Sequence, residues 1–229
     1  AAMLDGLEAA FDALSGMRAI VLRAGATDRV WCAGFDIGAL SPGFDPLAAD
    51  GALQALFHRI EESPAPVIAM MHGSAWGGGT DLALRCDISI ADPTCTLAFT
   101  PARLGLPYDL GGLLNVVMRA GPGVALEMFS TADPVPASRA LHLGLLNHVV
   151  EEAELEPFTL AMAHRIAANA PLSVQAAKQQ IRALAAIMPL PAGLAQQLAA
   201  SRRRALDSED FRDGLAAFHA RRTPEFNGR

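Results

Sequence analysis

The first 92 residues alternate between two kinds of apolar pattern, and this alternation limits the folds that the chain can adopt. Segments with apolar residues at helical spacing are 4–17, 51–63 and 80–87, and the short continuous apolar runs between them are 18–25, 66–73 and 88–92. The periodic segments predict amphipathic helices, and the continuous runs predict buried strands. Helices that alternate with strands are typical of a mostly parallel sheet covered by crossover helices. The sequence therefore predicts the α/β class.

The pattern changes near residue 150. The segment 93–138 holds short apolar pieces interrupted by prolines and by Gly111–Gly112, and 139–150 predicts a helix that runs into a strand. Beyond this point the sequence predicts helices only, over 154–170, 171–188 and 194–222. We therefore expect an α/β core over residues 1–150 and a helical region over 151–229.

Composition narrows the possible partners. The chain has 229 residues, 52% of them hydrophobic, and a formal net charge of −6 without a broad basic stripe, so nucleic acid is not an expected partner. We expect no membrane segment, because no apolar run approaches the length of a bilayer span, and no signal peptide, because no basic region precedes the apolar residues at the start. The three cysteines are scattered, without metal-ligand spacing, which predicts reduced thiols in the cytoplasm and no metal site. They are Cys32, Cys86 and Cys95.

Three consecutive glycines, 77–79, stand directly before the helix predicted over 80–87. Glycine loses more backbone freedom on folding than any other residue, so the triplet needs a reason. Close packing of the helix on a strand is one, and a phosphate loop is disfavoured because no Gly-Lys-Ser/Thr follows. An oxyanion hole is the third, because N–H groups at a helix N-terminus favour negative charge. A second glycine turn in "WCAGFDIGAL", 31–40, supports it, since each turn can supply one N–H to a shared oxygen.

Four stretches together resemble the crotonase family, also called the enoyl-CoA hydratase/isomerase superfamily. They are "CAGFDI", "GSAWGGGTDLALRCD", "TPARLGLP" and "LGLLNHVV". The resemblance covers essentially the whole chain and implies a ββα spiral core with a C-terminal helical region that joins subunits into trimers or hexamers. Members of the family bind acyl-CoA thioesters and hold a thioester enolate with two backbone N–H groups. Coenzyme A is then part of the substrate, and no separate cofactor is implied.

Carried over residue by residue, the resemblance assigns the two N–H donors to Phe35 and Gly78. The remaining residues that it assigns to substrate binding are Ala33, Gly34, Trp76, Gly77, Gly79 and Thr100. Gly77 and Gly79 would let the substrate and the helix approach each other. The family normally begins with a strand pair before its first helix, whereas this sequence begins almost at that helix, so the N-terminal strands are expected to be missing from it.

The carboxylates decide which reaction is expected. Hydratases of this family use two glutamates, because adding water requires paired acid and base groups. Asp81 holds the first position, one methylene shorter than glutamate, and the second falls at Pro101–Ala102, where no carboxylate exists. No Asp or Glu stands between Asp92 and Asp109. Ordinary hydration is therefore not expected.

The stretch "LGLPYDLGGLLN", with the later "DSEDF" and "RRTPEFNG", is most similar to the methylmalonyl-CoA decarboxylase branch of the family. In that branch a malonyl-type thioester loses CO₂ and leaves an enolate in the oxyanion hole, which requires no general base. The resemblance implies that Tyr108, the only tyrosine, orients the departing carboxylate and that Thr100 adds a hydroxyl to the pocket. Phe35 stands where this branch is expected to have histidine, so only a backbone donor is kept there.

Two other functions stay open. An enoyl-CoA hydratase or isomerase would use Asp81 or Asp109, and a catalytically weak acyl-CoA-binding protein would need neither. Asp81 could instead complement the dipole of its helix, and Asp109 could N-cap the helix expected to begin at Leu110. We expect Asp36 to fix its own loop rather than to act in catalysis.

Overall fold

The computed structural model describes residues 2–25, 28–39, 46–185 and 192–227, and it confirms the predicted α/β class. The strands are β1 (Ile20–Arg23), β2 (Val30–Cys32), β3 (Val67–Met71), β4 (Ser74–Trp76), β5 (Ile88–Ala91), β6 (Thr96–Ala98), β7 (Val135–Pro136) and β8 (His148–Val149). The α-helices are α1 (Ala2–Ala13), α2 (Pro46–Glu62), α3 (Gly78–Arg85), α4 (Leu110–Thr131), α5 (Ala137–His142), α6 (Glu152–Ala168), α7 (Pro171–Ala185), α8 (Ala192–Leu206) and α9 (Glu209–Ala220). Two 3₁₀ turns are η1 (Ile37–Ala39) and η2 (Pro101–Leu104). In these described ranges, every helix is too short or too polar to cross a bilayer.

The strands form two sheets that the chain visits in turn. The first sheet has the order β1-β3-β5-β8 and is parallel throughout. The second sheet has the order β2-β4-β6-β7, in which β2, β4 and β6 are parallel and β7 is antiparallel. Each of the first three consecutive pairs, such as β3 and β4, places one strand in each sheet before an α-helix follows. The units β1-β2-α2, β3-β4-α3 and β5-β6-α4 therefore build a ββα spiral.

The second sheet is the part that sequence patterns miss. Its strands β2, β4 and β6 have three residues each, which is too short to show an alternation of apolar and polar side chains. No strand is predicted over residues 74–76, yet Ser74–Trp76 pairs with both β2 and β6. Partners far away in the sequence hold these strands in place, because hydrogen bonds between strands outweigh weak local preference.

Two helical predictions need correction. Residues 110–131 form one long helical segment, α4, rather than short pieces, with a break at Gly121, whose φ is 82°. The helix predicted over 194–222 is two helices, because Ser208 begins α9 by accepting a hydrogen bond from the Phe211 amide at 3.0 Å. Helix α7 ends at Ala185, and the predicted continuation over 186–188 lies outside the described residues.

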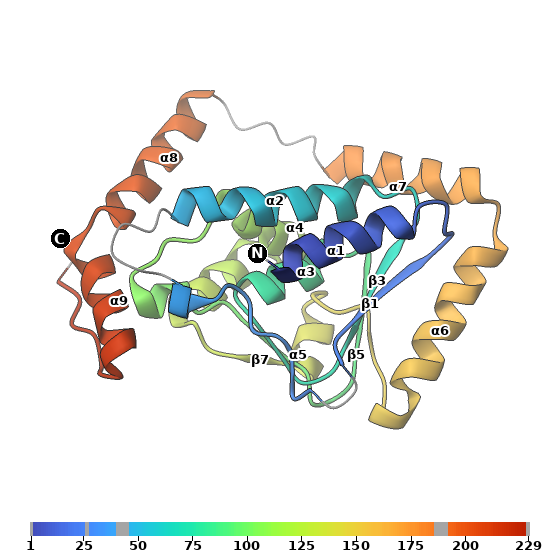
Figure 1. Ribbon diagram of the computed structural model, residues 1–229, viewed down its shortest axis with the longest axis horizontal. Helices are drawn as coiled ribbons and strands as arrows, with labels where there is room; N and C mark the ends of the chain where they lie inside the picture. Colours follow the sequence, from blue (N-terminus) through green and yellow to red (C-terminus); the bar gives the residue numbers. More distant parts are fainter. Residues whose placement is uncertain (1, 26–27, 40–45, 186–191, 228–229) are drawn as a thin grey trace.

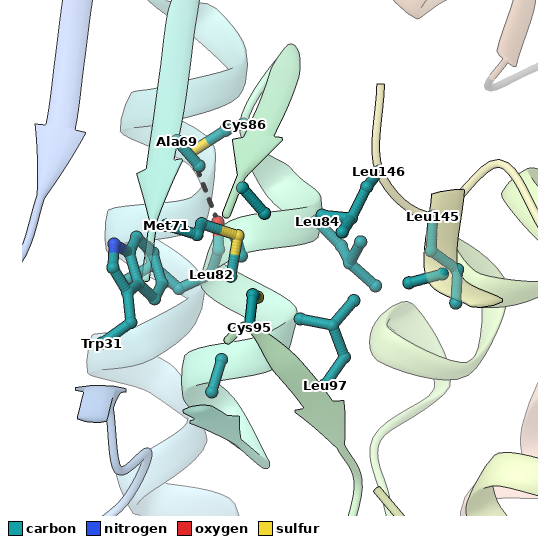
Figure 2. Close-up of a cluster of buried hydrophobic side chains, with 14 of the residues drawn as sticks. Trp31, Ala69, Met71, Leu82, Leu84, Cys86, Cys95, Leu97, Leu145 and Leu146 are labelled. Atoms are coloured by element: carbon teal, nitrogen blue, oxygen red, sulfur yellow. Dashed lines mark hydrogen bonds between the residues drawn. The ribbon is translucent and has the colours of Figure 1, made fainter. Parts of the chain in front are cut away.

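The main hydrophobic core lies between the sheets and the helices that follow them. Figure 2 shows its centre, where leucines of α3 face Met71 of β3, Leu97 of β6 and the segment after α5. Leu84, Leu97 and Leu145 have no exposed surface. The Cys86 thiol donates to the Leu82 carbonyl at 3.4 Å, and burial raises the pKa of that thiol to about 12. Residues 79–84 of α3 are all buried, and close packing around them gives the N-terminus of the helix a fixed position in the molecule.

Helices α6 and α7 lie at the opposite end of the molecule from α8 and α9 (Figure 1). Helix α7 is attached to the core by charge. Lys178, the only lysine in the sequence, is buried and donates to the carbonyls of Ile60 and Ala65 at 3.0 and 3.1 Å. Lys178 Nζ also lies 2.8 Å from Asp87 Oδ2, and the other oxygen of that carboxylate accepts a hydrogen bond from Arg182 Nη2 at 2.9 Å. The division at residue 150 remains a prediction, although the described part after Glu151 is helical.

Candidate active site

The two glycine turns predicted to share an oxygen meet in the structure. Gly34 has φ of 80°, and a Cβ atom on it would overlap the Trp76 carbonyl oxygen and lie 3.1 Å from the Gly78 nitrogen. Any side chain at residue 34 would therefore push the turns apart. A Cβ on Gly78 would lie 3.8 Å from the Phe35 nitrogen. The amides of Phe35 and Gly78 thus stand side by side.

The three glycines of the triplet have three different local environments. Gly77 has φ of 50° and ψ of −116°, which L side chains rarely adopt, and its N–H donates to the Ala98 carbonyl at 2.8 Å. Gly78 is the first residue of α3, where an N–H has no acceptor within the helix. A Cβ on Gly79 would lie 2.5 Å from the Cys32 carbonyl oxygen, so this glycine serves close packing. Of the three, Gly78 is the glycine that lies beside the Phe35 amide.

Thr80 fixes the N-terminus of α3 over the second sheet. Its side chain is fully buried, and Oγ lies 2.7 Å from the Ala75 carbonyl oxygen and 2.9 Å from that of Ala98. The Ala98 amide also donates to this hydroxyl oxygen at 3.3 Å. One hydroxyl therefore connects α3 to β4 and β6, and it holds the Gly78 amide in register with them. No sequence signal indicates this role of Thr80, apart from a polar residue in an apolar setting.

Asp81 lies one turn along α3, and its side chain is buried. Its Oδ1 accepts hydrogen bonds from Arg85 Nε at 3.3 Å and Asn115 Nδ2 at 3.2 Å. Among the described residues Oδ2 has no hydrogen-bond partner. Burial raises the pKa of Asp81 to about 6, although Arg85 and Asn115 lower it, and nearby Asp109 raises it further. The carboxylate is therefore held through one oxygen, inside the protein.

Arg85 belongs to a chain of charges that leads away from the site. Its Nη1 donates to Glu61 Oε1 at 2.8 Å, and its guanidinium carbon lies 5.0 Å from the Phe57 ring centroid. Arg182 lies 3.8 Å from the same Glu61 oxygen. The negative charge of Asp81 is therefore compensated by Arg85. Arg85 is in turn held by Glu61 of α2, and its carbonyl accepts a hydrogen bond from Arg182 of α7. The spacing of Asp81 and Arg85 at i,i+4 was the sequence signal for this pair, whereas nothing local pointed to Asn115.

Tyr108 stands at the start of α4 among aromatic rings. Its ring centroid lies 5.0 Å from those of Phe99 and Phe129, and the contact with Phe99 is edge to face. A Cβ on Gly112 would overlap the Tyr108 ring and lie 2.8 Å from Asp81 Oδ2. The ring and the Asp81 carboxylate therefore meet over the same glycine, so Gly112 is required by packing.

The other predicted residues are placed as follows. Asp109 is the N-cap of α4 and accepts from the Gly112 amide at 3.0 Å. Asp36 accepts from the Gly38 amide at 3.0 Å, which is the loop-fixing contact that we expected. Trp76 donates its indole N–H to Ser74 Oγ at 2.8 Å, and Thr100 is the N-cap residue of η2.

Phe35 and Ala33 are exposed, so the turn around Gly34 lies at the surface. Within the described part of the chain, no three His, Cys, Asp or Glu side chains are grouped to hold a metal ion. The assignment of Ala33, Trp76 and Thr100 to substrate binding stays a prediction.

Comparison with known proteins agrees with this geometry. The family model for enoyl-CoA hydratase/isomerase matches residues 1–229. The chain is 41% identical to methylmalonyl-CoA decarboxylase from Escherichia coli strain K12 over 213 residues, covering 93% of this chain and 82% of the relative. It is 35% identical to carnitinyl-CoA dehydratase from Proteus mirabilis, covering 92% and 82% of the two chains.

Solved structures show the same fold. A methylmalonyl-CoA decarboxylase in complex with 2-nitronate-propionyl-CoA matches with a TM-score of 0.93 and 40% identity, covering 99% of this chain and 88% of that one. An enoyl-CoA hydratase from Bacillus anthracis matches with a TM-score of 0.74 and 29% identity, covering 100% and 89%. The ββα spiral, the paired glycine turns and these matches agree: the chain belongs to the enoyl-CoA hydratase/isomerase family, the crotonase family that its sequence motifs resemble.

Proposed function

We propose that this enzyme decarboxylates a malonyl-type acyl-CoA thioester, with methylmalonyl-CoA as the leading candidate. The observation that carries the proposal is the pair of neighbouring amides at Phe35 and Gly78, which fits an oxyanion hole for the thioester oxygen. The similarity to methylmalonyl-CoA decarboxylase at 41% identity supports the choice of substrate. Chemistry that builds charge on that oxygen is the chemistry this site would accelerate.

In the proposed reaction the bond between C2 and the carboxylate carbon breaks. Its electron pair moves into the thioester as an enolate, CO₂ leaves, and C2 then takes a proton from solvent to give the shortened acyl-CoA. The N–H groups of residues 35 and 78 hold the enolate oxygen. Since no proton has to be removed, the reaction requires no general base.

Tyr108 would hold the carboxylate out of the thioester plane, so that the breaking bond aligns with the carbonyl π system. The aromatic contacts with Phe99 and Phe129 give this ring a fixed position, which is what orientation of a leaving group requires. Thr100 would add its hydroxyl to the same pocket. Phe35 contributes through its backbone.

A hydratase or isomerase is the second candidate, favoured by the 35% identity to a carnitinyl-CoA dehydratase. The site is poorly suited to it. Asp81 is buried and held by Arg85 and Asn115, and Asp109 is engaged as the cap of α4. A catalytically weak acyl-CoA-binding protein would share the amide pair but would not release CO₂.

The proposal includes assembly as trimers or pairs of trimers through the helices after residue 150. Large apolar side chains are exposed on α6 and α7, which together form one end of the molecule (Figure 1). They are Leu160, Leu172, Ile181 and Leu184, exposed by 42, 79, 65 and 68%. Ile181 and Leu184 stand three residues apart on α7 and so share one face of that helix, which supports an interface there. We also propose a cytoplasmic location, where the free thiols of the chain stay reduced.

Replacing Gly78 with proline tests the oxyanion hole. Proline is tolerated at the first position of a helix but has no N–H, so CO₂ release should fall by about 100-fold or more. Gly78→Ala is the matched control: it keeps the N–H, and the closest contact of its Cβ would be the flexible end of Leu53 at 3.3 Å, with the backbone of Phe35 and Gly34 at ordinary contact distance. Circular dichroism shows whether Gly78→Pro is folded. If the folded variant released CO₂ at the normal rate, the assignment of the Gly78 N–H to the oxyanion hole would be wrong.

Substrate choice tests the reaction. Methylmalonyl-CoA should be decarboxylated, and crotonyl-CoA at equal concentration should be hydrated slowly or not at all. Tyr108→Phe should lower CO₂ release at least about tenfold with little change in CoA affinity, because the carboxylate loses its orienting hydroxyl. CO₂ release and enoyl absorbance are the two readouts. Fast hydration that disappears in Asp81→Asn, without CO₂ release, would favour the hydratase.

The stability of the fold should depend on pH through Asp81. Because burial raises the pKa of Asp81 to about 6, the stability that its neutral form contributes is complete below the unfolded pKa near 4 and is lost as pH rises through 6. Asp81→Asn removes this dependence. The free energy of unfolding in urea is measured for the variant and the wild type at pH 5 and at pH 8. The difference, variant minus wild type, should be more positive at pH 8 than at pH 5 by about 1 kcal/mol. An equal difference at both pH values would contradict the raised pKa.

Light scattering at micromolar concentration tests the assembly, and a trimer or a larger multiple is expected. The double variant Ile181→Glu/Leu184→Glu places two charges in the proposed interface and should yield a monomer. Leu126→Glu, on α4, is the control, since Leu126 is equally exposed at 70% but lies outside these helices. A monomeric wild type would remove the proposal.

A further inference from the structure

Helix α9 touches the 3₁₀ turn η2 through backbone atoms, with no side chain between them. The buried residues of α9 lie on one face of the helix and are Phe211, Gly214 and Ala217. A Cβ on Gly214 would overlap the Leu104 carbonyl, and a Cβ on Gly105 would lie 2.8 Å from the Asp210 carbonyl oxygen. Glycine is therefore required on both sides of this contact, at positions 105 and 214 of the chain.

The turn that α9 touches lies between two residues of the candidate site. Thr100 directly precedes η2, and Tyr108 is the fourth residue after Leu104, the last residue of the turn. The turn is closed within itself, because the Arg103 amide donates to the Thr100 carbonyl at 3.0 Å and the Leu106 amide donates to the Pro101 carbonyl at 3.0 Å. A closed turn moves as a unit, so a displacement at Leu104 carries through to the residues that follow.

The Tyr108 ring has little freedom to absorb such a displacement. It is packed against Phe99 and Phe129 and fills the space that a side chain at Gly112 would occupy. Its position is therefore determined from two directions, by the aromatic rings on one side and by the chain arriving from η2 on the other.

We propose that α9 is a positioning element for Tyr108, and that the backbone contact between Gly214 and Leu104 sets where the tyrosine meets the carboxylate of the substrate. The inference rests on the proposed role of Tyr108 in decarboxylation. Gly214 acts only through η2. Misplacing an orienting group by about 1 Å can cost as much as 100-fold in rate, so a single methyl group at this contact has a measurable effect.

The test is a double-mutant cycle on CO₂ release. Gly214→Ala should lower kcat about tenfold and leave the KM for methylmalonyl-CoA within about twofold. In the Tyr108→Phe background the same substitution should lower kcat by less than about twofold, because the residue that it displaces has already lost its function. Gly6→Ala, on α1, is the matched control, since a Cβ there meets nothing within 4 Å.

Each arm has a distinct meaning. If Tyr108→Phe alone left CO₂ release unchanged, the proposed function of Tyr108 would fail, whatever Gly214→Ala does. If Tyr108→Phe slowed CO₂ release but the effect of Gly214→Ala multiplied with it, α9 would be only structural and the inference would fall. If Gly214→Ala does not fold, Phe211→Leu is the substitute, because it removes less packing from the same face of α9. It should lower kcat in the wild-type background and have little effect on kcat in the Tyr108→Phe background.

Discussion

The site depends on one close approach, in which the turn at Gly34 presses against the backbone of Trp76 and Gly78. No side chain fits at residue 34, and its positive φ suits glycine. Because β2 and β4 are adjacent strands of the second sheet, the turns that leave them emerge at the same edge. Burial of α3 and the Thr80 hydroxyl then hold the Gly78 amide in place. Two backbone groups thus acquire a fixed geometry without the loss of side-chain entropy that a pair of polar residues would suffer.

The charges beside this pair explain why the same fold can favour one reaction over another. A carboxylate that activates water must reach the substrate and change its protonation state during turnover. Asp81 is shorter than glutamate, and Arg85 and Asn115 hold its Oδ1 inside the protein. Arg85 is in turn anchored by Glu61. Removing one partner from such a buried set is costly, so the network resists the movement that acid–base work would require.

Much of the first sheet and both glycine turns could be predicted from the sequence, because apolar periodicity and glycine turns are local signals. The α/β class, the helices up to α3 and the strands β1, β3 and β5 followed from them. The second sheet could not be predicted, since strands of three residues depend on partners elsewhere in the chain. The same limit applies within the site. The spacing of Asp81 and Arg85 was visible, whereas the contact of Asn115 with Asp81 and that of Gly214 with Leu104 exist only after folding.

The place of Lys178 has a consequence for an enzyme that handles activated acyl groups. A thioester acylates accessible amines, and the lysine side chain is the usual target because its free base is a nucleophile. The only lysine in this sequence is buried, with its three N–H bonds directed at Ile60, Ala65 and Asp87. The other cationic side chains at neutral pH are arginines, whose guanidinium groups keep their protons. The described surface therefore exposes no ε-amine to chemical damage by the acyl-CoA that the enzyme is proposed to consume.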